Sequence, residues 1–369
     1  MFTKSLIYLC SVPLALVAAC GPPLPEDAVA EIAQSGINYN DISLNGINFN
    51  GINYNGFNYN GFNYNGINYN GFNYNSATAP ALEGVYYSGI SLGGKDLGGA
   101  RIEGPVLMAT RSSDGQLLRG AELTGAVLGG RVRMGADYVT VPLRIDRVDT
   151  DAAGLVRYTV SLRSGSQWSP LCGTRSDGSP NRAVALHNRW NETTGAPIVD
   201  SSLFTFACEH AAIGKCVVWG YRPWATATEC LSNDKTCRNQ PLAAWHQACT
   251  RMVRADYCGD GRPHTRNGTP INVWDPLGIQ SQDITDWQLE AEWTQEGAVC
   301  IRHTRWERAD SLAAETDLAY IQRVCPERLA SNSRGKTCSE TRSDFVTKNG
   351  LRDDLDERPL LRNQSVEGY

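Results

Sequence analysis

Cysteine content constrains the fold of this chain more than any other feature. Of the 12 cysteines in 369 residues, ten lie in one segment, 172–338. An even number within one segment predicts five disulfides, which persist in exported proteins. No two of the ten have the C-x₂₋₄-C spacing of a zinc site, so we expect neither a metal nor a cofactor. The cysteine count does not show which cysteines bond to each other, although the short spacing of Cys230 and Cys237 suggests that these two are paired. The ten are Cys172, Cys208, Cys216, Cys230, Cys237, Cys249, Cys258, Cys300, Cys325 and Cys338.

The N-terminus has the pattern of an export signal. Residues 1–19 carry one cation, Lys4, then an apolar run that ends in small residues. The following VAAC, residues 17–20, resembles the lipobox of bacterial lipoproteins, in which the cysteine is acylated and becomes the mature N-terminus. This resemblance implies a lipid on Cys20 and, because Gly21 follows it, an outer-membrane lipoprotein that faces the periplasm or the cell surface. The alternative is an ordinary cleaved signal followed by a chance cysteine.

The charge balance gives no sign of a nucleic-acid partner. There are 34 Lys and Arg against 39 Asp and Glu, for a formal net charge of −5, whereas nucleic-acid binding needs clustered cations. No second apolar run of spanning length follows the signal. We therefore expect a water-soluble body that meets the membrane only through its N-terminal lipid.

A pentapeptide repeat follows a proline-containing linker at residues 20–35. Eight units fill residues 36–75, and most of them read G-[IF]-N-Y-N. The pattern resembles the pentapeptide-repeat family, which implies a four-sided right-handed β-solenoid. Asn replaces the small inward residue of that family, so a disordered low-complexity stalk is the alternative. We extend the repeat region to 36–110 because apolar residues keep the five-residue phase at Ala77, Leu82, Tyr87, Leu92, Leu97, Ile102 and Leu107.

Residues 130–340 predict a second domain that is mainly β with a few helices, a β-rich α+β fold stapled by disulfides. Period-two alternation predicts two β-hairpins and one short strand, whereas 3.6-residue periodicity predicts two helices. The polar stretch 341–369 has no core pattern and is expected to be a loose tail. The predicted hairpins are 139–145 with 156–162 and 287–294 with 298–306, the strand is 271–275, and the helices are 242–253 and roughly 311–324.

One stretch, MVRADYCGDGRPHTRNG at 252–268, concentrates side chains that are able to do chemistry. Its tetrapeptide Ala255-Asp256-Tyr257-Cys258 and the sequence around it resemble the ADYC domain, a family found in bacterial lipoproteins. The likeness extends from about Cys208 to the strand GAVCIRHTRW. The family has no described activity, so the resemblance implies a domain and its extent but no reaction.

Two hypotheses compete for this stretch. If the chain is an enzyme, Cys258 is the nucleophile, His264 or His246 its base, and Asp256 their neighbour. The even cysteine count instead favours a disulfide at Cys258 and no catalytic residue.

The two acidic residues of this stretch also have the D-x-x-x-D-G skeleton of a calcium loop. Cys258 and Asn267 stand where that loop needs oxygen ligands, which weakens the calcium interpretation. We therefore expect Asp256 and Asp260 to accept hydrogen bonds from local backbone N–H groups and to pair with a nearby arginine.

Aromatic residues supply the remaining candidates. Exposed indole rings would line a groove for carbohydrate or peptide, whereas buried ones would only complete the core. The candidates are Trp190, Trp219, Trp224, Trp274 and Tyr221.

Together these features predict a lipid-anchored surface or periplasmic protein with a structural or binding role and a protein or polysaccharide partner. The alternative is a secreted hydrolase that acts on wall or extracellular polymer through the loop 256–264. Association of exposed repeat coils between molecules is a third hypothesis.

Overall fold

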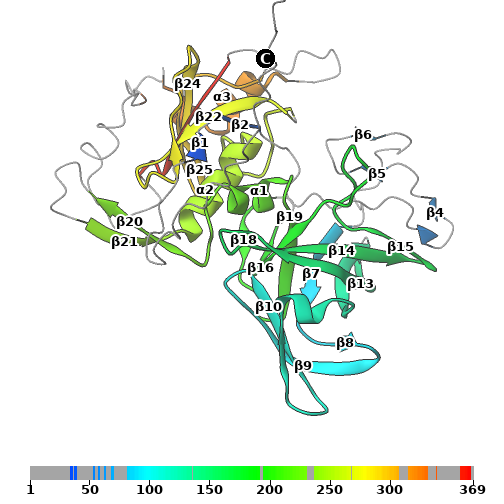
Figure 1. Cartoon of the computed structure of the whole chain (residues 1–369). Helices are drawn as coiled ribbons and strands as arrows, with labels where there is room; N and C mark the ends of the chain where they lie inside the picture. Colours follow the sequence, from blue (N-terminus) through cyan, green and yellow to red (C-terminus); the bar gives the residue numbers. More distant parts are fainter. Residues whose placement is uncertain are drawn as a thin grey trace, which may run out of the picture. The chain divides into compact units, whose positions relative to one another are not determined.

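The computed structural model in Figure 1 describes the chain in several stretches. The predicted signal segment, residues 1–19, and Cys20 lie outside them. No helix within the described residues is long and apolar enough to cross a membrane. Besides short strands between residues 34 and 69, the described residues are 81–134, 136–191, 194–230, 237–266, 268–306, 315–330, 338 and 358–366.

Six antiparallel strands form a closed barrel. Strand β7 pairs with β12 on one side and with β19 on the other, which closes the ring β7-β12-β13-β14-β16-β19. Strand β15 (Gln167–Pro170) adds to the edge of β14. The six strands are β7 (Ala81–Tyr86), β12 (Val127–Met134), β13 (Asp137–Thr150), β14 (Val156–Ser164), β16 (Ala183–His187) and β19 (Leu203–Cys208).

The predicted hairpin 139–145 with 156–162 is confirmed as β13 and β14. Its alternating apolar residues point into the barrel, where Leu143, Tyr158 and Val160 are buried. Gly130 on β12 faces the same core, and a Cβ at this position would lie 2.7 Å from Leu82. The core side chains therefore pack directly against the Gly130 backbone, and a larger residue would have to displace the Leu82 methyl.

The solenoid expectation was wrong for residues 81–110. This part of the chain forms β7 and three further strands, which pair in antiparallel fashion and extend the sheet beyond β12. The five-residue phase nevertheless marked core residues, since Ile102 pairs with Leu107 and both are buried. Tight turns between short strands place apolar residues at the same spacing as a solenoid does. The added strands are β8 (Ile90–Leu92), β9 (Lys95–Glu103), β10 (Val106–Arg111) and, next to β10, β11 (Leu117–Arg119), which precedes the 3₁₀ turn η1 (Gly120–Leu123).

The repeat itself is described only in short strands. β1 (Gln34–Ser35) pairs in parallel with β23 (Gln280–Ser281), and β2 (Ile37–Tyr39) pairs with β22. Apart from β2 and the two strand pairs named below, residues 36–75 lie outside the described residues, so the choice between solenoid and stalk stays a prediction. Two further pairs are β3 (Asn53–Tyr54) with β4 (Phe57–Asn58) and β5 (Phe62–Asn63) with β6 (Asn68–Tyr69).

A separate five-stranded sheet has the order β2-β22-β26-β24-β25. The predicted strand 271–275 and the second predicted hairpin are confirmed in it as β22 and as β24 with β25. Helix α2 packs on this sheet, mainly against β24. The remaining strands are β22 (Pro270–Trp274), β24 (Gln288–Thr294), β25 (Gly297–Ile301) and β26 (Leu361–Ser365).

Three α-helices occur in the described residues, and α2 and α3 confirm the two predicted helices. Helix α3 starts at Asp317 because the Thr316 side chain caps it by accepting a hydrogen bond from the Ala319 N–H at 3.1 Å. Helix α1 was not predicted. The elements that complete the fold are α1 (Ala212–Val218), α2 (Ala243–Arg254), α3 (Asp317–Val324), the 3₁₀ turn η2 (Pro326–Arg328), and the strand pairs β17 (Arg189–Trp190) with β18 (Pro197–Ile198) and β20 (Thr226–Cys230) with β21 (Cys237–Pro241).

The expectation of a loose polar tail was wrong for residues 358–366. Strand β26 lies inside the five-stranded sheet, between β22 and β24. Its polar side chains find buried partners: the Arg362 guanidinium lies 2.8 Å from Glu292, and Arg358 makes two hydrogen bonds, at 2.7 and 2.8 Å, to Glu229. A polar sequence can occupy a sheet interior when every charge has such a partner.

All ten cysteines of 172–338 are paired, as predicted. The Cys216–Cys249 bond joins α1 to α2, and the hairpin of β20 and β21 is closed by the one pair that spacing suggested. The five disulfides are Cys172–Cys208, Cys216–Cys249, Cys230–Cys237, Cys258–Cys325 and Cys300–Cys338.

Candidate functional site

The ADYC corner, defined here as residues 255–259, begins where helix α2 ends. Ala255 takes the left-handed conformation, with φ of 50°, and reverses the chain. The Asp256 N–H then donates to the Arg251 carbonyl at 2.9 Å, as in a helix C-cap. The Ala255 methyl is fully buried in the core beneath the sheet, a contact that glycine would not make.

The Asp256 carboxylate is fully buried and binds two groups. It pairs with the Arg251 guanidinium and accepts from the Gly261 N–H at 3.1 Å. Arg251 in turn donates to the carbonyls of Thr194 at 2.5 Å and Gln295 at 3.2 Å. The predicted local role of Asp256 is thus confirmed, and the pair connects α2 to two distant loops.

Tyr257 anchors the corner in the five-stranded sheet. Its hydroxyl donates to Glu290 at 3.0 Å and accepts from the Arg305 N–H at 2.9 Å, and its ring stacks on Trp293 with centroids 5.3 Å apart. Burial raises the pKa of the Tyr257 hydroxyl well above 10, so the group stays protonated.

A fully buried ion pair completes this network. Arg305 donates to both carboxylate oxygens of Glu290, at 2.9 and 2.8 Å, and also to the carbonyls of Val253 and Met252 near the end of α2. Burial alone would raise the pKa of Glu290, but the charge and hydrogen bonds of Arg305 outweigh burial and the pKa is lowered. Arg305 therefore neutralises the carboxylate and satisfies the open helix end at the same time.

Cys258 and Gly259 pin the corner on its other side. The Cys258 sulfur is bonded to Cys325, just after helix α3. A Cβ on Gly259 would lie 1.9 Å from the Glu296 carbonyl oxygen, and its φ of 73° also requires glycine. A sulfur atom in a disulfide is not a thiolate nucleophile, so the structure does not assemble the thiol site of the enzyme hypothesis.

His264 and Asp260 contact helix α3 instead of Cys258. The Nδ1 atom of His264 lies 2.8 Å from Asp317, and both side chains are fully buried. Asp260 accepts from the Tyr320 hydroxyl and from the Arg262 N–H at 3.0 Å. The oxygens of a calcium loop would have to converge on one point, whereas here Asp256 and Asp260 are each bound to protein donors.

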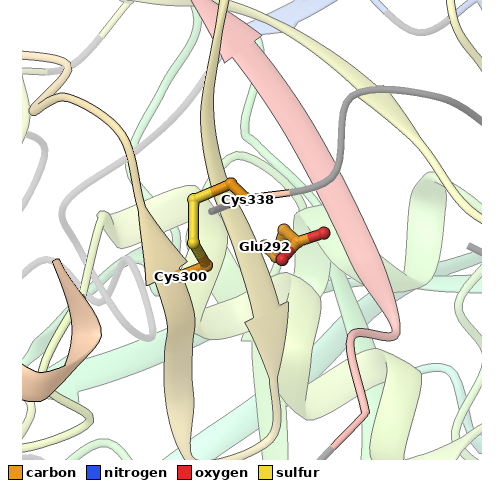
Figure 2. A group of neighbouring side chains, drawn as sticks. All are labelled: Glu292, Cys300 and Cys338. Atoms are coloured by element: carbon orange, nitrogen blue, oxygen red, sulfur yellow. A yellow bond between two sulfur atoms is a disulfide. The ribbon is translucent and has the colours of Figure 1, made fainter. Parts of the chain in front are cut away.

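Among the described residues, one group has the spacing of metal ligands: Glu292, Cys300 and Cys338. Figure 2 shows that the two sulfur atoms are bonded to each other beside the Glu292 carboxylate. That carboxylate also pairs with Arg362. With the disulfide closed, the group lacks the thiolates that would bind a soft metal.

The aromatic candidates separate into two sets. Trp190 and Trp224 line a pocket of about 240 Å³, and Trp219, Trp274 and Tyr221 do not. Trp190 is nevertheless buried, at 7% exposed, as are Trp219, Trp274 and Tyr221, whereas Trp224 is partly exposed. His246, the second proposed base, lines the same pocket, and its Nε2 donates to the Ile213 carbonyl at 3.0 Å.

Three residues of the buried network around the corner and His264 were not predicted from sequence, namely Glu290, Arg305 and Asp317. A signal for Glu290 exists in the strand WQLEAEWT, where an acidic residue interrupts an apolar run. Alternation of this kind is typical of a strand with one solvent-facing side, but both faces of β24 are buried.

The comparisons with known proteins add the family. The ADYC domain model matches residues 118–307, more than half of the chain. The match includes the tetrapeptide 255–258 and reaches back into the barrel strands. No curated protein and no solved structure matches the chain. The chain belongs to the ADYC domain family.

Proposed function

We propose that this chain is a lipid-anchored protein of the bacterial outer membrane, facing the periplasm or the cell surface, and that its ADYC domain has a binding or structural role. The VAAC segment at 17–20 supports the lipid anchor. The five disulfides support an exported, oxidising location.

One observation carries the binding role over a catalytic one. The side chains of the ADYC corner that are able to do chemistry, and that of His264, have structural partners and are sealed from solvent: Asp256, Tyr257 and His264 are each 0% exposed. A general acid, base or nucleophile must reach its substrate. The pocket lined by Trp190 and Trp224, at the start of helix α2, has a composition that suits binding.

The alternative, a secreted hydrolase that acts through loop 256–264, receives less support. Its nucleophile Cys258 is held in a disulfide, and its base His264 faces Asp317 rather than a thiol.

The lipid anchor is tested by expressing the full chain and its Cys20→Ser variant in a bacterium that has an outer membrane. The wild-type N-terminal peptide should carry acyl chains on Cys20 by mass spectrometry, and the protein should sediment with outer membranes. Cys20→Ser should lose both properties. Cys10→Ser is the matched control, because Cys10 leaves with the signal, and it should behave as wild type. Wild-type protein with an unmodified Cys20 in the soluble fraction would refute the anchor. If the protein is acylated, protease treatment of whole cells shows which side of the outer membrane it faces, because only surface-exposed protein is cut.

A further inference from the structure

The pocket lined by Trp190 and Trp224 lies where β16, β17 and β18 meet the start of helix α2. Most of its walls are apolar, and no carboxylate, ammonium or guanidinium lines it. Val199 at its edge is 88% exposed. The lining residues are Leu186, His187, Asn188, Trp190, Pro197, Val199, Pro223, Trp224, Ala243, His246 and Gln247.

The walls of this pocket are held in place before any ligand arrives. The Trp190 indole N–H donates to Gln247 at 3.1 Å, and the Gln247 amide donates to the Gly195 carbonyl at 2.9 Å. His187 accepts from the Tyr87 hydroxyl at 3.1 Å and donates to the Ile102 carbonyl at 2.7 Å. A preformed site loses little conformational entropy on binding.

His246 gives the pocket one buried acceptor. Because its Nε2 faces the Ile213 carbonyl, that nitrogen carries the proton and Nδ1 is the bare acceptor. Burial lowers the pKa of His246 to about 4, so the ring is neutral at pH 7. Among the described residues no donor is hydrogen-bonded to Nδ1, and the His246 side chain, which is 1% exposed, lines the pocket. A wholly apolar ligand that covered Nδ1 would leave it unpaired, at a cost of about 1–3 kcal/mol.

Asn188 gives the pocket a second polar group. Its backbone is held at φ of 70°, while its side-chain amide makes no hydrogen bond within the described residues. An amide offers both a donor and an acceptor. The pocket therefore combines a partly exposed indole, Trp224, and the largely buried Trp190 with two uncharged polar groups.

We propose that this pocket binds one ring of a neutral sugar, as the end or side unit of a glycan. The apolar C–H face of the ring packs against Trp190 and Trp224, one hydroxyl donates to His246 Nδ1, and others pair with the Asn188 amide. Flat apolar walls combined with neutral hydrogen-bonding groups match such a ring. A uronate is disfavoured, because its carboxylate would be desolvated without a cation. This inference rests on the proposed binding role.

The test uses the mature, disulfide-intact protein and titrates neutral oligosaccharides of glucose, galactose, mannose and N-acetylglucosamine, with glucuronate-containing ones for comparison. Calorimetry and tryptophan fluorescence report binding. At least one neutral glycan should bind saturably and the glucuronates more weakly. Trp224→Ala should weaken binding about tenfold or more. Asn188→Gly, which tolerates the left-handed backbone and removes only the amide, should weaken it severalfold.

Two controls separate the outcomes. Trp168→Ala removes a half-buried tryptophan on β15 that contacts Arg144 instead of the pocket, and it should bind as wild type. Circular dichroism melting shows whether each variant is folded. Absence of binding to every neutral glycan, or binding that survives both pocket variants, overturns the sugar assignment. Saturable binding of the peptide GFNYN in place of sugars would identify a peptide pocket instead. None of these results affects the acylation test of Cys20, so the two proposals fail separately.

Discussion

Arg251 and Asp256 form an ion pair across the end of helix α2, with 3% and 0% of their side chains exposed. The pair holds the acidic residue of the ADYC tetrapeptide against the helix from which the chain has just turned. The other three residues of the tetrapeptide have equally local tasks: Ala255 makes the turn, Tyr257 enters the sheet network and Cys258 forms the disulfide. The tetrapeptide is thus a structural joint between α2, the five-stranded sheet and α3.

Asp256→Asn should destabilise the protein strongly. The amide keeps the shape of the side chain, but it leaves the buried Arg251 charge without its partner, which costs roughly 3–5 kcal/mol. Urea unfolding with intact disulfides, followed by circular dichroism, measures the loss. Asp286→Asn changes an exposed carboxylate in the same way and should stay within about 0.5 kcal/mol of wild type. Equal losses in the free energy of unfolding for the two variants would contradict the role of the tetrapeptide as a structural joint.

No cysteine of 172–338 should react with an alkylating agent in the native protein. The expected mass is that of the fully oxidised chain, with Cys258 recovered in one peptide with Cys325. The double variant Cys258→Ser, Cys325→Ser should fold with a free energy of unfolding roughly 2–4 kcal/mol lower, because a long loop is released. Rapid native labelling of Cys258 would instead restore the thiol-enzyme hypothesis.

Removing residues 358–369 should prevent assembly of the five-stranded sheet. The deletion takes out β26, so β22 and β24 lose their shared partner, and Glu229, Glu290 and Glu292 lose Arg358, Asn363 and Arg362. Limited proteolysis should then cut within 270–301, which the intact protein resists. Addition of the peptide RPLLRNQSV should restore part of this resistance through strand addition. A truncated chain that resists protease as the intact one does would show that β26 is dispensable.

His246 should make the protein less stable in acid. The unfolded chain binds a proton at this site below its ordinary pKa of 6.5, whereas the folded chain does so only below about 4. The neutral His246 therefore makes its full contribution to the free energy of unfolding above pH 6.5. This contribution falls by about 3 kcal/mol in total as the pH drops to 4.

A second group acts in the opposite direction over part of this range. Burial raises the pKa of Asp275 from 3.8 to about 6, so its contribution to stability is present below pH 3.8 and is lost as the pH rises through 6. The difference between wild type and His246→Gln isolates the histidine, since Asp275 is common to both. Urea midpoints at pH 7, 5.5 and 4.5 should converge for the two proteins as the pH falls, and parallel curves would contradict a neutral buried His246.

Local patterns were enough for the local parts of this fold. Alternating apolar residues predicted the hairpin of β13 and β14, and 3.6-residue periodicity predicted α2. An even number of cysteines predicted that Cys258 is bonded rather than free. Each of these signals depends only on which side chains seek burial over a short stretch of chain.

Partners distant in sequence were decided only by the tertiary structure. Cys258 joins Cys325 across 67 residues, and Arg362 reaches Glu292 across 70. The same limit explains why two predictions were wrong, the solenoid over 81–110 and the loose tail over 358–366. A five-residue apolar spacing fits a solenoid as well as short hairpins. A polar C-terminal stretch does not show that its arginines will pair with buried glutamates elsewhere in the chain. Sequence periodicity reports whether a residue is buried, whereas the choice of partner depends on packing and charge neutralisation among segments that meet only in the folded chain.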